Sequence, residues 1–183
     1  ITPEMVNSEF MKKAAESASS DIDIVDSDLL FAKSNQQITT PRLVIESNHD
    51  KIYMKKHHRR LLKELQLAAE MMEEEHQDEP NRKIKYDPNI KVFINKGDMT
   101  TWRIFLKGPD NSPYENKWWY LIATFPESYP INPPTFRFIT IPYHINISTD
   151  GMVCLDFTDA KYKPEIHPID MIKGIRELLL HPN

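Results

Sequence analysis

The chain has 183 residues, of which 40% are hydrophobic and 27% charged, with a formal net charge of −4 at pH 7 and a single cysteine. This length suits one domain with an extension, because a domain of about 150 residues buries close to 70% of its unfolded surface. One cysteine excludes an internal disulfide, no apolar run approaches the roughly 20 residues that span a bilayer, and no basic-then-apolar leader follows Ile1. We therefore expect a processed chain with a free thiol in a reducing compartment, the cytoplasm or the nucleus.

Residues 1–47 are predicted to form an acidic extension ahead of a core domain at residues 48–183. The first 50 residues hold four Lys or Arg against nine Asp or Glu, so the negative charge of the chain is concentrated there. They also show little hydrophobic periodicity. Low hydrophobicity combined with net charge is typical of disordered segments, and we expect most of this extension to be disordered.

Within the extension, β-branched residues are flanked by aspartates over residues 22–28. The pattern resembles a SUMO-interacting motif, in which such a segment adds as a strand to an exposed sheet edge and its acids meet basic residues there. The apolar members of the segment are Ile22, Ile24 and Val25. The alternative is an ordinary acidic, turn-prone stretch, because short motif matches are only hypotheses.

Apolar residues next recur every three or four positions and form one stripe, which predicts a helix over residues 48–75. The members of the stripe are Met54, His58, Leu61, Leu65, Ala68 and Met72. Pro80 ends this helical region. The charged segment Glu73–Asp87 lies at its end, and its sequence indicates no function.

Four strands and a second helix follow. Residues 90–94 and 102–106 are largely apolar on either side of a turn signal around Gly97, which predicts a hairpin. Two further strands are predicted at residues 118–125 and 135–139, with prolines confined to the connections. A helix is predicted from Pro168 to Leu180, because proline suits a first helical turn. The order predicts an α+β fold with an N-terminal helix, a four-stranded antiparallel meander, a long loop and a following helix.

The long loop, residues 141–157, contains the only cysteine, Cys154. Residues at eight and three positions before it, and at eight and ten positions after it, are Asn146, Gly151, Tyr162 and Pro164. A proline-punctuated run lies upstream. With this pattern the sequence closely resembles the ubiquitin-conjugating enzymes over roughly residues 55–183, and their fold is the one expected here.

The resemblance implies that Cys154 carries ubiquitin or a related protein as a thioester and passes it to a lysine amine. Asn146 matches the asparagine that stabilises the oxyanion formed during transfer, either directly or by holding the loop through its backbone, and Asp156 matches an acid near the incoming lysine. Three residues are implied to structure the loop rather than act chemically: Tyr143, His144 and Gly151. Neither a metal nor a bound cofactor is implied, because ATP is used upstream by the activating enzyme.

The resemblance also implies two protein-binding surfaces. Basic residues of the first helix are implied to meet the activating enzyme and the ligase: Arg59, Arg60 and Lys63. Ile131 and Pro164 are implied to be hydrophobic contacts for a ligase, of the RING type. The cargo is ubiquitin or a relative such as NEDD8 or SUMO, and neither nucleic acid nor a membrane is an expected partner.

The chain departs from the family pattern in several places. Ile145 replaces the central proline of His-Pro-Asn, Ile131 replaces a common phenylalanine, and residues 162–165 replace Trp-Ser-Pro-Ala. The chain also stops at Asn183, where family members continue through further helices. We therefore expect a core domain that is shortened at its C-terminus.

Three other interpretations stay open. A non-catalytic scaffold variant of the same fold would bind ubiquitin without chemistry. A cysteine hydrolase would need His144 within hydrogen-bond reach of Cys154. Finally, a lone cysteine is often a small buried hydrophobic residue with no chemical role.

Overall fold

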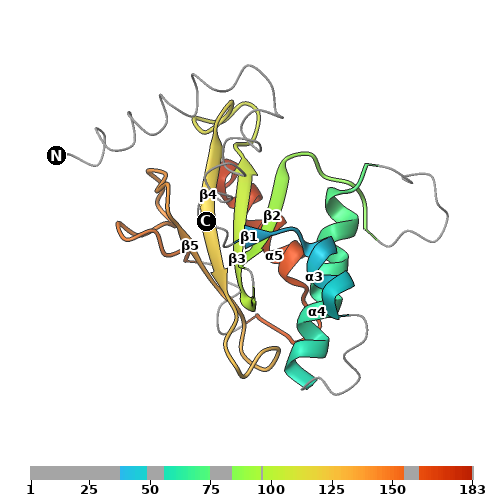
Figure 1. Cartoon of the computed structure of the whole chain (residues 1–183). Coiled ribbons are helices and arrows are strands. Elements are labelled where there is room, and N and C mark those ends of the chain that lie inside the picture. The colour runs from blue at the N-terminus through green and yellow to red at the C-terminus, as the bar shows by residue number, and fades with distance from the viewer. Residues whose placement is uncertain (1–37, 49–55, 75–83, 96, 155–160, 183) are drawn as a thin grey trace. The chain divides into compact units, whose positions relative to one another are not determined.

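A computed structural model of the chain describes residues 38–48, 56–74, 84–95, 97–154 and 161–182 (Figure 1). In chain order the elements are β1 (Ile38–Thr39), α3 (Pro41–Asn48), α4 (Lys56–Met72), β2 (Ile90–Asn95), β3 (Asp98–Lys107), β4 (Trp118–Thr124), β5 (Thr135–Phe138) and α5 (Pro168–Leu180). In the described parts of the chain, every helix is too short or too polar to cross a membrane.

The strands form one sheet in the order β1-β2-β3-β4-β5, in which β2 to β5 pair antiparallel as a meander. Gly97 lies in the turn between β2 and β3 with a φ of 77°, a conformation that glycine adopts without steric cost. The predicted α+β fold with a four-stranded antiparallel meander is confirmed. The two-residue strand β1 adds to its edge and was not predicted.

Alternation along the strands divides the sheet into an inner and an outer face. On β3, Trp102, Ile104 and Leu106 are fully buried at 0% exposure. Phe105 lies between two of them and points to the outer face, where its ring stacks on Tyr120 with 4.9 Å between the centroids. The inner face therefore carries the core.

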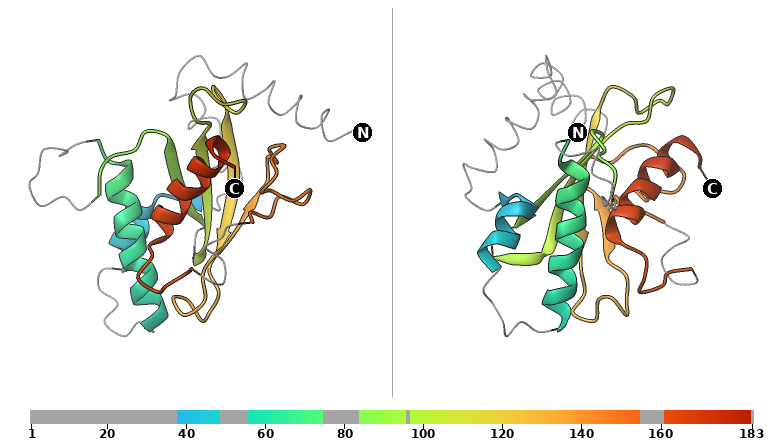
Figure 2. Two further views of the ribbon diagram at one scale, coloured as in Figure 1. Left: turned by 180° about the vertical axis from the view of Figure 1, so that it is seen from behind. Right: turned by 90° about the vertical axis from the view of Figure 1, so that its right-hand side faces the viewer.

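Helices α4 and α5 cover this inner face of the sheet (Figures 1 and 2). Helix α4 contributes Leu61 and Leu65, and α5 contributes Ile169, Ile172 and Ile175, all at 0% exposure within the same hydrophobic cluster as the strands. Helix α5 has the predicted bounds and begins at a buried proline. The connections at the ends of these helices and strands carry the candidate site.

The beginning of the structured region differs from the sequence prediction. Residues 38–47, which were assigned to the extension, form β1 and most of α3. Helix α3 is attached to the end of α4 because Val44 is 7% exposed and Arg42 donates hydrogen bonds of 2.6 to 3.0 Å to the Glu73 carboxylate. Of the helix predicted over residues 48–75, the structure describes α4 (Lys56–Met72), and residues 49–55 lie outside the described residues. The SUMO-interacting segment and the disorder predicted for residues 1–37 lie outside the described residues.

Candidate active site

Cys154 is exposed at the end of a loop that folds back on itself. The loop is closed by an antiparallel bridge between Ile147 and Val153. Immediately beyond that bridge, the Cys154 backbone N–H donates a 2.8 Å hydrogen bond to the Asn146 carbonyl. The backbone therefore brings Cys154 and Asn146, two of the three predicted catalytic residues, side by side. The third, Asp156, lies outside the described residues.

The turn at the tip of this loop requires a glycine. Gly151 has a φ of 87°, and a Cβ atom built on it would lie 2.1 Å from the carbonyl oxygen of Phe138. That close approach is used, because the Phe138 N–H donates a 2.8 Å hydrogen bond to the Gly151 carbonyl. The Gly151 N–H in turn donates to the Ser148 carbonyl at 2.9 Å. The position of Gly151 agrees with its predicted role in structuring the loop.

His144 lies inside the loop as a neutral side chain. It is 9% exposed, and its Nδ1 accepts a 3.1 Å hydrogen bond from the Asn146 backbone N–H. Burial lowers the pKa of His144, and the nearby Leu178 backbone only partly offsets this effect. One ring nitrogen is occupied by Asn146 and the other is buried, so His144 is not placed to act as the base of a cysteine hydrolase.

Tyr143 and Ile145 flank this histidine and point into solvent, with exposures of 101% and 82%. The prediction that Tyr143 structures the loop did not specify which of its groups does so, and the exposed side chain does not. Its carbonyl does, because it accepts a 2.6 Å hydrogen bond from the Tyr114 hydroxyl. The loop also closes with Ile145 in place of proline, since the Ile147 N–H donates to the His144 carbonyl at 3.1 Å.

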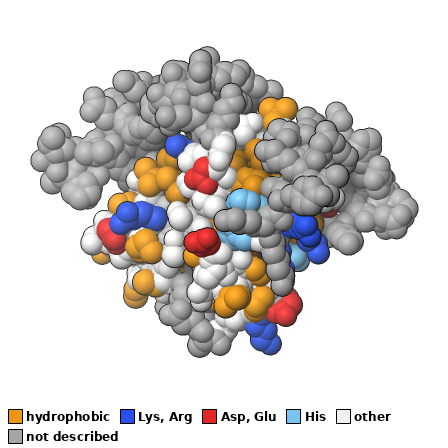
Figure 3. Space-filling view, turned by 60° about the horizontal axis from the view of Figure 1, so that its bottom comes forward, with side chains coloured by type: hydrophobic (Ala, Val, Ile, Leu, Met, Phe, Trp, Pro, Cys, Tyr) orange, Lys and Arg blue, Asp and Glu red, His pale blue; other side chains and the backbone are white. Residues whose placement is uncertain are grey.

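The predicted ligase contacts lie on two other connections, which are linked to each other. Ile131 is 77% exposed and Pro164 is also exposed. The Tyr162 hydroxyl donates a 2.9 Å hydrogen bond to the Pro130 carbonyl and so joins the two connections. We call residues 129–131 and 162–164 the paired loops. The corresponding end of the molecule shows apolar side chains in separate groups among charged and histidine side chains (Figure 3).

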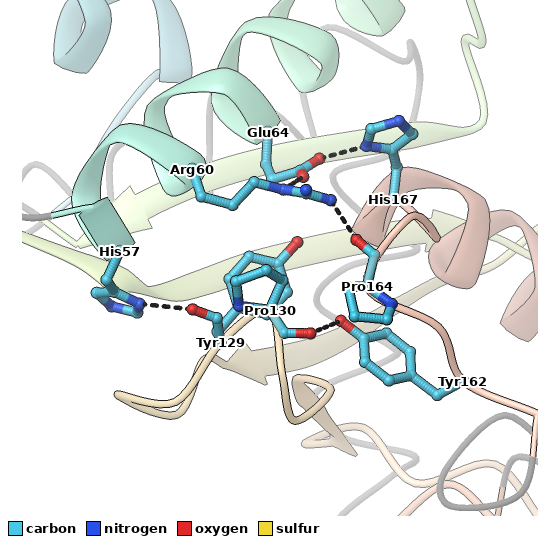
Figure 4. Close-up of polar contacts among 8 residues, drawn as sticks. All are labelled: His57, Arg60, Glu64, Tyr129, Pro130, Tyr162, Pro164 and His167. Atoms are coloured by element: carbon cyan, nitrogen blue, oxygen red, sulfur yellow. Dashed lines mark hydrogen bonds and ion pairs between the residues drawn. The ribbon is translucent and has the colours of Figure 1, made fainter.

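The three basic residues predicted to bind partners are not equivalent. Arg59 and Lys63 are exposed on α4. Arg60 points inward, where its Nη2 donates a 2.6 Å hydrogen bond to the Pro164 carbonyl and its Nε donates one of 2.5 Å to the Glu64 carboxylate (Figure 4). Burial opposes the Arg60 charge, but Glu64 outweighs it and raises the pKa of Arg60. Arg60 therefore connects α4 to the paired loops.

Sequence reasoning missed the residue that holds Arg60. Glu64 is completely buried at 0% exposure, and its second oxygen lies 2.9 Å from His167 Nδ1. A signal was present, because Glu64 lies on the same helical stripe as Leu61 and Ala68. Among the described residues, no group of three or more His, Cys, Asp or Glu could hold a metal ion.

A family model for ubiquitin-conjugating enzymes matches residues 60–183 of this chain. Among curated proteins, the chain is 40% identical over 96 residues to a probable bifunctional E2/E3 enzyme of Acanthamoeba polyphaga mimivirus. That match covers 52% of this chain and 7% of the relative, so the similarity is to a small part of a much longer protein.

Solved structures share the fold. The E2 domain of a Toxoplasma gondii ubiquitin conjugating enzyme has a TM-score of 0.57 and 29% identity, covering 70% of this chain and 77% of its own. A Plasmodium vivax ubiquitin conjugating enzyme E2 has a TM-score of 0.54 and 23% identity, covering 66% and 98%. The second likeness is one of fold alone.

Proposed function

Because the chain belongs to the ubiquitin-conjugating enzyme family, we propose that it accepts ubiquitin as a thioester on Cys154 and passes it to a lysine amine. The observation that carries this proposal is the exposed thiol of Cys154, held beside Asn146 by a backbone hydrogen bond of 2.8 Å. An exposed thiol is accessible to a second protein. A cysteine retained only for packing would be buried.

The proposed reaction has two acyl transfers. In the first, the Cys154 thiolate attacks the thioester carbonyl of ubiquitin on the activating enzyme, and the thiolate of that enzyme leaves. In the second, an uncharged lysine amine attacks the new thioester, the tetrahedral intermediate expels the Cys154 thiolate, and the amine proton passes to a base. Asn146 is the proposed donor to the oxyanion, and Asp156 is the proposed group that orients the amine.

The proposed partners follow from the exposed surfaces. Arg59 and Lys63 are exposed on α4 and suit the activating enzyme. Ile131 and Pro164 are exposed on the paired loops and suit a ligase of the RING type. A cytoplasmic or nuclear location, and SUMO binding through Ile22, Ile24 and Val25, rest on the sequence alone.

Two alternatives use the same fold. The cargo is NEDD8 or SUMO in the first, and the second is a ubiquitin-binding scaffold without chemistry. The exposure of Cys154 favours the enzyme over the scaffold. Nothing in the geometry of the described residues discriminates among the three cargo proteins.

One reaction tests the proposal. The chain is mixed with activating enzyme, ATP and ubiquitin, and the products are separated without reductant beside Cys154→Ala and Cys154→Ser variants. We expect a band that reductant removes from the wild-type chain, none for the alanine variant, and a reductant-resistant ester for the serine variant. Absence of a band with ubiquitin, NEDD8 and SUMO alike would refute the enzyme.

A further inference from the structure

A buried carboxylate with no place in the transfer chemistry lies beneath the paired loops. The side chain of Glu64 has 0% exposure, whereas Arg60 and His167, which contact its two oxygens, have 24% and 32%. Charged side chains are rarely buried to this degree unless paired, because desolvation of the charge is costly. Both oxygens of Glu64 are used, each on a different partner (Figure 4).

The two partners of Glu64 connect it to two points of one loop, Pro164 and His167. Arg60 Nη2 donates to the Pro164 carbonyl at 2.6 Å. His167 comes three residues later and immediately precedes α5 as its N-cap, where its side chain makes no capping hydrogen bond. Its Nδ1 lies 2.9 Å from Glu64 instead. Glu64 therefore holds the segment from Pro164 to His167 at both of its ends, through Arg60 at Pro164 and directly at His167.

The other loop of the pair is held by the same helix. His57, at the start of α4, donates from Nδ1 to the Tyr129 carbonyl at 3.2 Å. The Arg60 guanidinium lies over the Tyr129 ring, 5.9 Å from its centroid. The pKa of Tyr129 is raised by burial and further by the charge of Glu64. The ring of Tyr129 and the loop at Pro164 therefore both contact Arg60, which is itself held by Glu64.

We propose that Glu64 is a positioning residue for ligase recognition: its buried carboxylate holds Arg60 and His167, and through them fixes the spacing of Ile131 and Pro164. This inference rests on the proposed function, in which the paired loops bind a RING domain. Recognition of the ligase then depends on a side chain that the ligase does not touch. The thiol chemistry does not depend on it, because the loop around Cys154 is closed by its own backbone hydrogen bonds.

The central variant is Glu64→Gln, which keeps the shape of the side chain but replaces the negative charge beside Arg60 with a neutral amide. Its matched control is Glu177→Gln, an exposed carboxylate on α5. A second variant, Arg60→Lys, keeps the positive charge beside Glu64 but loses the fork that reaches Glu64 and Pro164 together. It keeps the inference testable if Glu64→Gln does not fold.

The measurements separate loop position from chemistry. The first is the δ1-methyl NMR signal of Ile131 in the full chain, with that of Ile145 as the internal reference. The second is charging of Cys154 with ubiquitin and discharge to free lysine without ligase. The third is discharge with an isolated RING domain, taken from a panel as the one that most stimulates the wild-type chain.

We expect Glu64→Gln to move or broaden the Ile131 signal and to lower RING-stimulated discharge about tenfold, because loss of the Glu64 charge weakens the hydrogen bonds that hold Arg60 and His167. Charging and RING-free discharge of Glu64→Gln should stay within about twofold of wild type, as they should for the exposed control Glu177→Gln. A folded Glu64→Gln or Arg60→Lys variant with a wild-type Ile131 signal and wild-type RING stimulation would overturn the inference.

Failure of the proposed function can be distinguished from failure of the inference about Glu64. If the wild-type chain forms no thioester, the function fails. If it forms one but no RING domain stimulates its discharge, the ligase assignment fails. In either case the Ile131 signal alone decides whether Glu64 positions the paired loops. A changed signal supports that role, and an unchanged one refutes it.

Discussion

The loop around Cys154 and the paired loops both end in exposed side chains, but they are held in place differently. Backbone hydrogen bonds close the first, as between the Cys154 N–H and the Asn146 carbonyl, and its side chains at Tyr143 and Ile145 project into solvent. The paired loops also have backbone hydrogen bonds, as between the Ile131 N–H and the Ser128 carbonyl, but they are in addition tied to α4 by its side chains, above all the buried Glu64 and its partner Arg60.

The difference has a consequence for substitution. A loop closed by its backbone tolerates changes in its outward side chains, which explains how Ile145 replaces a proline without opening it. A loop held by distant side chains is sensitive to substitutions far away in the sequence. Arg60 and the Pro164 carbonyl that it binds are separated by 104 positions.

The largest loss of stability is expected from Gly151→Ala, which disturbs the backbone of the active-site loop. A Cβ atom would lie 2.1 Å from the Phe138 oxygen at a φ of 87°, so the free energy of unfolding should fall by at least about 3 kcal/mol. Gly97→Ala is the control: it also has a positive φ but no atom within 4 Å, and should cost about 1 kcal/mol. Urea denaturation measures both, and equal losses would contradict the role of the close approach.

Arg60→Ala should be next, and it tests the other side of the comparison. It leaves the buried Glu64 carboxylate without its cation, which should lower the free energy of unfolding by about 3 kcal/mol. Arg59→Ala removes a neighbouring exposed arginine and should change it by no more than about 0.5 kcal/mol. Denaturation of the two variants side by side checks this. A similar loss for both would place Arg60 among ordinary surface charges.

Tyr114→Phe should have a smaller effect on the active-site loop. It removes the hydroxyl that donates to the Tyr143 carbonyl at 2.6 Å, worth about 1 kcal/mol. Tyr143→Ala removes a side chain that is 101% exposed and should cost no more than about 0.5 kcal/mol. Thermal unfolding compares them. If Tyr143→Ala were the more destabilising, the side chain and not the carbonyl would structure the loop.

The smallest effect concerns pH. Burial lowers the pKa of His144 below its ordinary value of 6.5, so the unfolded chain binds the proton more tightly than the folded chain. This contribution to stability is complete above pH 6.5 and is lost as the pH falls through the folded-state pKa. The wild-type chain should therefore lose stability between about pH 7 and pH 5 that a His144→Asn variant does not lose. Equal pH profiles in urea denaturation would contradict this.

The sequence predicted the strands and α5 closely because each had a strong local signal. Apolar residues at alternating positions located the later part of β3, residues 102–106, and Pro168 located the start of α5, whereas residues 98–101 were not predicted as strand. Helix α3 was missed because its attachment depends on Arg42 and Glu73, which are 31 positions apart.

The candidate site divides in the same way. The resemblance implied that Cys154 and Asn146 act together, and both lie within the one long loop predicted at residues 141–157. The inward position of Arg60 was not predictable, because its partners are a backbone carbonyl far along the chain and a glutamate that reads as half of a surface pair at i and i+4. Likewise, sequence alone does not tell whether Tyr143 contributes its ring or its carbonyl.

The single cysteine also determines how this protein responds to oxidants. Cys154 is exposed and has no second thiol within these 183 residues. A sulfenic acid formed on it therefore has no internal thiol with which to condense, and its repair depends on a small thiol such as glutathione. Until that thiol arrives, further oxidation to the irreversible sulfinic acid competes with repair. If Cys154 carries the cargo as proposed, oxidation of this one sulfur atom would stop the transfer.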